Sequence, residues 1–406
     1  MPPKQTRSPV EWVLSFLSSF GLATVTLIFL LIITLLGTLD QVDNGLFESQ
    51  KKYFDAALVW GVSFGKTHIP IVLPGGFLLM LILTVNIILG AVRRIRKTPR
   101  KIGILIAHLS MIFLLVAGAV SFFFKKDGNM ALFEGQTSDE FQSYHDSVIE
   151  IERVQPAPKD GKRTALIIPG TEYRDLDAGK GRVFTNDSLP FDLWVMNYME
   201  NATPRRVKPG DTHQWQTDGY YLQALPAEKD QEMNLDAAMI KIVDKKTKTE
   251  QPGLLWREEA APFAFKIGDE TYNIHLTRRS WKLPFAVKLD KFVRELHPGT
   301  AQARKFTSYV TKIQDKHEEK KVITMNAPLR DSGHILFQAS FQQSQAGDVK
   351  RSVFAVVQNP ADQWPLIALL AAALGLLIHM VDMLVRFLIR SSRQNRPASA
   401  VSSVSP

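Results

Sequence analysis

The sequence of 406 residues contains no cysteine, and this absence excludes several kinds of chemistry at once. The chain cannot form a disulfide, a Cys-x-x-Cys redox centre, a thiolate zinc site or a c-type haem attachment motif of its own. It also lacks a P-loop, a dinucleotide fingerprint and the Gly-x-Ser-x-Gly motif of serine hydrolases. The spacing of its histidines is not that of a zinc protease or a zinc finger. None of these classes of protein is predicted.

The net charge of +9 does not indicate binding to nucleic acid, because the basic residues gather beside long apolar segments. Positive charge next to membrane spans sets the orientation of a membrane protein, with the basic loops in the cytoplasm. Two such groups are present, one between two apolar segments and one after the last: Arg93, Arg94, Arg96, Lys97, Arg100 and Lys101, then Arg386, Arg390, Arg393 and Arg396.

Four apolar segments are long enough to cross about 30 Å of hydrocarbon, which takes roughly 20 helical residues. They predict a polytopic α-helical membrane protein with three N-terminal spans and one C-terminal span, at residues 13–37, 71–92, 102–124 and 364–388. Both basic groups then lie in the cytoplasm, as do both termini. The first apolar run lacks a small-residue cleavage pattern, so we expect an uncleaved anchor rather than a signal peptide.

The spans divide the chain into an N-terminal membrane domain, a large extracytoplasmic domain, the fourth span and a disordered cytoplasmic tail: residues 1–124, 125–363, 364–390 and 391–406. Between the first two spans, residues 47–60 predict a short amphipathic helix at the membrane surface. The large domain alternates apolar and polar residues in short runs separated by Pro, Gly and Asp clusters, which predicts an antiparallel β sandwich or barrel. The clearest runs are residues 147–154, 238–243, 263–267, 271–276 and 285–289.

Two histidines lie inside predicted spans, His108 in the third and His379 in the fourth. An ionisable residue in a span is costly and predicts a function. Counted along helices that rise 1.5 Å per residue, both lie roughly 10 Å from the cytoplasmic side. At matched depth they could ligate one metal centre, because haem iron readily takes axial histidines.

Each histidine also has a structural explanation. His108 could join helices by hydrogen bonds to Asn86, Thr84 or Ser110. Asp382, one turn from His379, could orient that histidine or extend to the headgroups. Outside the spans, His68 could touch a ligand at the outer face of the membrane.

The order of several motifs resembles the ResB (also called CcsB) family of System II cytochrome c biogenesis. Span one ends Leu35-Leu-Gly-Thr-Leu-Asp-Gln41, similar to the family's Gly-Thr-x-x-x-Gln, with the Gln one residue sooner. Span three contains Gly103-Ile-Leu-Ile-Ala-His-Leu-Ser110 and then Ala117-Gly-Ala119, similar to the family's Gly-x-x-x-x-His-x-Gly/Ser and Gly-Ala pattern. The resemblance is poor over residues 155–270.

The large domain contributes further similar segments. Leu283-Pro-Phe to Phe292 resembles a Leu-Pro-Phe … Asp-x-Phe segment, and Pro298-Gly-Thr300 with Phe306-Thr-Ser308 resembles the turn and strand that follow it. Asn326-Ala-Pro-Leu329, then Gly333 to Ser340, resembles an Asn-x-Pro-Leu … Gly-x-x-x-x-Gln-x-Ser block; Ser352 to Pro360 resembles the strand before the last span. His334 departs from the pattern, where an aromatic residue such as Tyr is expected.

The resemblance implies a membrane subunit of a cytochrome c haem lyase. It implies a ResC/CcsA-type partner that carries a tryptophan-rich haem motif, haem b as a transient cofactor, and apocytochrome c as the substrate. It assigns His108 as a haem iron ligand, with the second ligand coming from the partner, so that a role for His379 competes with it. Without cysteine the chain cannot relay reductant, so a thioredoxin-like protein would keep the substrate thiols reduced. No catalytic residue is assigned.

Two other functions remain open from the residues alone. A membrane-anchored adaptor would bind an envelope partner through its β domain without a cofactor. A small-solute transporter is disfavoured, because four spans without an internal repeat offer little of an alternating-access machine.

Overall fold

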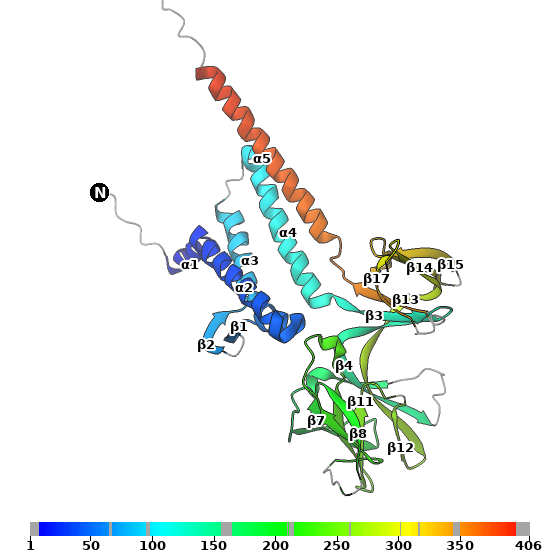
Figure 1. Cartoon of the computed structure of the whole chain (residues 1–406). Helices are drawn as coiled ribbons and strands as arrows, with labels where there is room; N and C mark the ends of the chain where they lie inside the picture. The colour runs from blue at the N-terminus through cyan, green and yellow to red at the C-terminus, as the bar shows by residue number, and fades with distance from the viewer. Residues whose placement is uncertain are drawn as a thin grey trace, which may run out of the picture. The chain divides into compact units, whose positions relative to one another are not determined.

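The computed structural model describes residues 8–64, 67–94, 98–155, 165–208, 210, 215–259, 261–300, 302–315, 317–343 and 350–394. The chain divides into two compact units: a helical unit, Met1–Lys125 with Asn359–Pro406, and a β domain, Lys126–Gln358 (Figure 1). Among the described residues, four helices are long and apolar enough to cross a membrane. Strands make up most of the β domain. The predicted fold class is confirmed.

The helical unit contains five α-helices: α1 (Pro9–Leu17), α2 (Phe20–Gln50), α3 (Gly76–Arg93), α4 (Ile102–Phe124) and α5 (Trp364–Gln394). A short 3-10 turn, η2 (Pro99–Lys101), leads into α4. Helix α3 contacts α1, α2 and α4, and α4 contacts α5. The predicted tail at 391–406 begins as helix, because α5 continues to Gln394; residues 395–406 lie outside the described residues.

The first predicted span is not one continuous helix. A break at Ser18 and Ser19 separates α1 from α2, because both helix ends find polar partners there. The Ser19 Oγ accepts a hydrogen bond from the Leu22 N–H at 3.0 Å, and so caps α2. The Asn86 amide of α3 donates to the carbonyls of Leu17 (2.6 Å) and Ser19 (3.0 Å). Carbonyls freed by the break are thereby satisfied without water.

The segment predicted as a surface helix at 47–60 is helical only in its first part. Helix α2 kinks at Gly45, where φ is 78°, and a π-helical turn, η1 (Lys51–Asp55), follows it. The buried Asp40 fixes this turn, because its carboxylate accepts hydrogen bonds from Ser49 (2.8 Å) and Lys52 (2.9 Å). The chain then forms a hairpin of β1 (Leu58–Phe64) and β2 (Thr67–Pro74) instead of more helix.

The β domain contains three sheets, all with antiparallel pairing. The largest has the order β15-β14-β13-β4-β3-β18-β17-β16, with β12 beside β13 and β5 beside β4; a second has the order β11-β10-β7-β6, and β8 pairs with β9. Their bounds are β3 (Lys126–Phe133), β4 (Thr137–Gln155), β5 (Ala165–Pro169), β6 (Gly181–Phe184), β7 (Phe191–Met199), β8 (Ala202–Arg206), β9 (Tyr220–Ala224), β10 (Ala237–Asp244), β11 (Glu250–Trp256), β12 (Phe263–Ile267), β13 (Glu270–Leu296), β14 (Ala303–Gln314), β15 (His317–Thr324), β16 (Leu329–Asp331), β17 (His334–Gln343) and β18 (Lys350–Gln358). Two 3-10 turns, η3 (Gly170–Glu172) and η4 (Gln231–Met233), also belong to this domain.

Three hydrophobic clusters lie in the described part of this domain, and the long strands β4 and β13 contribute to the two larger ones. The first core is a sandwich, in which Ile149 and Ile274 of the large sheet pack with Phe191 and Ile240 of the second sheet. The second core is enclosed by the other half of the large sheet. It contains Phe141 of β4, Phe285 of β13 and Phe354 of β18. Alternating burial along each strand produces both cores.

All five predicted strand runs lie within strands of the structure, but two of them belong to a single strand. Residues 271–276 and 285–289, given above as separate runs, are both parts of β13, and Pro284 lies between them. A proline has no N–H to donate to a neighbouring strand. Pro284 is accommodated because the register between β13 and β4 shifts between Lys282 and Val287, so no ladder hydrogen bond is required there.

Candidate functional site

His108 lies in the second turn of α4, half-buried, and its ring has a defined hydrogen bond. The Nδ1 atom is 3.2 Å from the carbonyl oxygen of Ile104, one turn earlier in the same helix. A carbonyl only accepts, so this contact requires the proton on Nδ1, and in that tautomer of the imidazole Nε2 carries the lone pair. This is the arrangement of a metal-ligating histidine, in which a backbone carbonyl fixes the tautomer and orientation of the ring.

The three polar side chains weighed as partners of His108 bond elsewhere. Thr84 donates to the Met80 carbonyl at 2.7 Å and Ser110 to the Ile106 carbonyl at 2.8 Å, each within its own helix. Asn86 holds the break between α1 and α2. Of the explanations for His108, joining helices through these residues has no support in the structure.

His379 differs from His108 in its surroundings. Its Nδ1 atom is buried without a hydrogen-bond partner among the described residues. Asp382 does not orient it, because the Asp382 carboxylate forms an ion pair with Arg386, four residues further along α5, with Nε 3.0 Å from Oδ1. The ring of His379 is therefore polar, desolvated and not positioned by a second group.

Helices α4 and α5 touch at two glycines, and this contact sets their register (Figure 1). A Cβ atom on Gly103 would lie 2.5 Å from the Gly375 carbonyl oxygen and 2.7 Å from the His379 nitrogen. His379 of α5 thus lies opposite Gly103 of α4. Gly103 precedes His108 by five residues in α4. At 1.5 Å per residue the two histidines are offset by about 7.5 Å along the helix axis. The matched depth inferred from the sequence is wrong, because counting from helix ends ignores which residues allow the backbones to meet.

The residues present fit a haem group with one axial ligand from this chain. The donor set is one imidazole in an apolar helix, and its Nδ1 is bonded to a backbone carbonyl so that Nε2 would face the iron. Among the described residues no group of three or more His, Asp or Glu side chains could hold a bare metal ion. Iron bound through a porphyrin needs only axial protein ligands, so His108 suits haem and not a multidentate metal site.

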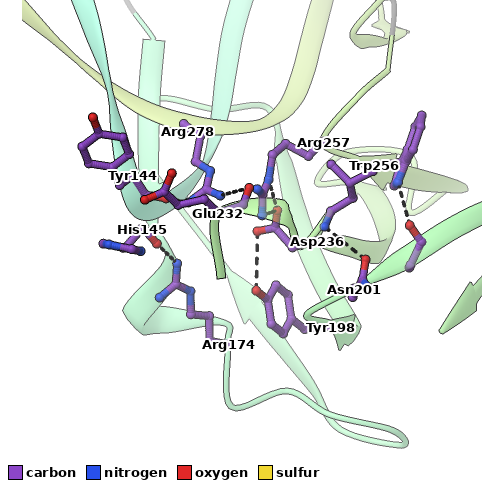
Figure 2. Close-up of polar contacts among 12 residues, drawn as sticks. Tyr144, His145, Arg174, Tyr198, Asn201, Glu232, Asp236, Trp256, Arg257 and Arg278 are labelled. Carbon is purple, nitrogen blue, oxygen red and sulfur yellow. Dashed lines mark hydrogen bonds and ion pairs between the residues drawn. The ribbon is translucent and has the colours of Figure 1, made fainter. Parts of the chain in front are cut away.

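A second polar cluster lies in the β domain, where the two cores meet (Figure 2). Strand β4 bulges at residues 143–146, since Arg278 pairs with Ser147 but Ser280 pairs with Gln142. The bulge removes the carbonyls of Tyr144 and His145 from the ladder, and the side chains of Arg278 and Arg174 donate to them. Burial lowers the pKa of Arg278 to about 10. These arginines support the backbone of β4.

The carboxylate of this cluster also has a structural partner. Asp236 is fully buried, precedes β10, and forms an ion pair with Arg257, just after β11. The Tyr198 hydroxyl of β7 lies 3.5 Å from the same carboxylate (Figure 2). The pair ties three strands together at one end of the second sheet. The sequence offered no spacing to indicate it, because Asp236 and Arg257 meet only through strand pairing.

Three of the motif segments quoted above converge on one buried network. The Gln338 amide donates to the Ser352 hydroxyl at 2.9 Å, and the Ser308 hydroxyl donates to the Gln338 side-chain oxygen at 2.5 Å. Ser308 and Ser352 are fully buried. They come from β14 and β18, with Gln338 on β17, so the network links strands that are far apart in the sheet order. The Gln-x-Ser segment therefore contributes to the fold.

Replacing Gln338 by alanine should destabilise the β domain by about 3 kcal/mol, because it opens a cavity and leaves two hydroxyls with fewer partners. The measurement is urea unfolding of the full chain in detergent, followed by tryptophan fluorescence. Gln342→Ala is the matched control, since Gln342 is an exposed residue of the same strand bonded to Arg351. It should change stability by less than about 0.5 kcal/mol. If the two substitutions destabilise the domain equally, the network does not contribute to its stability.

His334, where an aromatic residue was expected, occupies an aromatic environment. Its buried ring lies 6.4 Å from the centroids of both Phe141 and Phe285, edge to face with each. The Ser332 carbonyl is 2.8 Å from Nδ1. The His334 ring therefore packs between two aromatic rings, as the expected aromatic side chain would.

Comparison with known protein families gives one match in this region. Residues 265–396 match the model of the ResB-like family. This part of the chain is ResB-like. The ResB-like region comprises the end of β12, strands β13–β18 and α5, and so includes the Gln338 network and His379. The resemblance recognised in the sequence is confirmed over these residues, and the match does not extend to the motifs of spans one and three. The ResB-like family is associated with cytochrome c biogenesis, a membrane-associated system. A comparison with curated proteins finds no match.

Proposed function

We propose that this chain is the membrane subunit of a System II cytochrome c haem lyase. It helps to move haem b across the bacterial inner membrane and, with a ResC/CcsA-type partner, to attach it to apocytochrome c. The observation that carries the proposal is the hydrogen bond from His108 Nδ1 to the Ile104 carbonyl, which leaves Nε2 as a preset iron ligand inside a span. The ResB-like region supports the biogenesis system in which this ligand would act.

Each part of the chain has a role in this proposal. His108 would hold the haem iron through Nε2, and the Ile104 carbonyl would keep the imidazole in position. When bound, haem supplies the porphyrin that apocytochrome thiols modify. Bond formation occurs on the partner, and a thioredoxin-like protein keeps those thiols reduced, since this chain has no cysteine. The basic residues around α3, α4 and α5 keep the termini in the cytoplasm and the β domain outside.

A partner is favoured by the small area that the spans bury. In the apolar windows of the four candidate spans only 11–22% of residues are buried. Most of the apolar surface of the spans is therefore not covered by the helical unit itself. Lipid or another helical protein would cover it. His379 lies about 7.5 Å off the level of His108 along the helix axis, so the partner is the better source of the second axial ligand.

The proposal is tested by purifying the chain with and without a ResC/CcsA-type partner and recording visible spectra. We expect a Soret band with sharp reduced α and β bands in the complex, together with haem attachment to co-expressed apocytochrome c. A complex that assembles but remains colourless with ample haem would overturn the proposal. The adaptor function, without a cofactor, would then be the better explanation.

A further inference from the structure

A small pocket of about 170 Å³ lies in the β domain beside the hairpin β8–β9 and the end of β11. It opens to solvent and is lined mainly by apolar and aromatic side chains, with one buried carboxyl group. The residues that matter for its chemistry are Tyr220, Leu222, Trp256, Glu259 and Phe263. Its volume suits the head group of a side chain, and is smaller than a drug-sized ligand requires.

Glu259 is the unusual member of this lining. Its Oε2 atom is buried and has no hydrogen-bond partner. Burial raises the pKa of Glu259 to about 7, and only a backbone hydrogen bond with Trp256 opposes the shift. The cation nearest in sequence, Arg257, is committed to Asp236. A carboxylate that is desolvated and lacks a cationic partner carries an uncompensated cost, which a bound cation would remove.

The aromatic rings around Glu259 are held in place by the fold. The indole of Trp256 donates from Nε1 to the Ala202 carbonyl at 2.9 Å, which fixes the ring. Phe263 packs against Gly253, where a Cβ atom would lie 2.8 Å from the ring. The turn after β11 is closed by the Glu259 N–H on the Trp256 carbonyl at 3.1 Å. Rings of this kind attract cations through their faces, most strongly when the cation is desolvated.

We propose that this pocket binds an organic cation, an ammonium or guanidinium group of the size found at the end of a lysine or arginine side chain. The charge of Glu259 and the faces of the surrounding rings would act together on the same group. Among the described lining residues there is no lysine or arginine to compete for the carboxylate, and the other acid, Asp218, adds negative charge at the rim. The site is separate from the haem role of the helical unit.

The test is isothermal titration of the full chain in detergent at pH 8 with three probes: N-acetyl-lysine methylamide, n-butylammonium and the neutral N-acetyl-norleucine methylamide. We expect both cations to bind and the neutral compound to bind at least tenfold more weakly. Tighter binding of the lysine derivative than of butylammonium would identify a polypeptide as the source of the cation. Equal affinity would identify a free amine. Norleucine binding as tight as lysine would overturn the proposal.

Glu259→Gln should weaken cation binding at least tenfold, whereas Glu258→Gln, at the exposed neighbouring residue, should leave it unchanged. An independent readout in the wild type is carbodiimide labelling at pH 6, which modifies protonated carboxyl groups and is located by mass spectrometry. Glu259 should label, and guanidinium, which is not a nucleophile at this pH, should protect it. Labelling that does not change with guanidinium, or equal binding by both variants, would contradict the assignment.

Discussion

Replacing His108 by alanine is expected to lower the haem bound by the purified complex by roughly tenfold or more. The expectation follows from the geometry of the ring. A neutral imidazole whose Nδ1 is bonded to the Ile104 carbonyl can present only Nε2 to iron. Alanine removes the ligand without disturbing another helix, because within the described part of the chain the His108 ring bonds only to its own helix. The measurement is haem content by absorbance, relative to protein.

Two substitutions separate ligand loss from general damage to α4. Ser110→Ala changes a buried residue two positions away that bonds only within its own helix, and should keep full haem content. His379→Ala should also keep most of the haem if the partner supplies the second ligand. A His108→Ala complex with the haem content of the wild type would exclude His108 as the ligand.

Replacing Gly103 by leucine should separate α4 from α5. A Cβ atom at this position would meet the Gly375 carbonyl and the His379 backbone, and neither can move without moving a helix. We expect a loss of about 3 kcal/mol or more, at or above the upper end of ordinary overpacking, since backbone rather than side chain must give way. Thermal unfolding in detergent, followed by circular dichroism, measures the change.

Gly118→Leu is the matched control for Gly103→Leu. It introduces the same side chain into the same helix, at a glycine whose added Cβ meets nothing within 4 Å. This variant should unfold at or slightly above the wild-type temperature, because leucine is a better helix former than glycine. If both leucine variants unfold at the same temperature, the close contact between α4 and α5 does not stabilise the helical unit.

Much of this architecture follows from sequence periodicity. Apolar length predicts the four spans, and alternation predicts the strands, because a helix in lipid and a half-buried strand each impose a pattern on every residue. The break at Ser19 did not follow, because the Asn86 side chain that satisfies it lies in a different helix. The continuity of β13 did not follow either, because the alternation is clear only in the two separate runs 271–276 and 285–289, and the pairing of β13 with β4 that joins them is seen only in the fold.

The candidate site was predictable in part. An ionisable residue in an apolar helix drew attention to His108, but its tautomer depends on a single rotamer that no sequence pattern encodes. The relation of His108 to His379 was mispredicted, because helix register depends on where Gly103 and Gly375 let two backbones touch. Glu259 gave no signal, since its burial arises from loops and strands that meet only in the fold.

The most direct test of the central proposal is rescue of a cavity variant. His108→Gly in the complex with the partner should lose its Soret band, and added imidazole should restore it, because free imidazole can occupy the vacated space and bind the iron. The same addition should leave the wild-type spectrum unchanged. If His108→Gly retains the wild-type spectrum, or if imidazole restores nothing at saturating concentration with folded protein, His108 is not the intramembrane haem ligand.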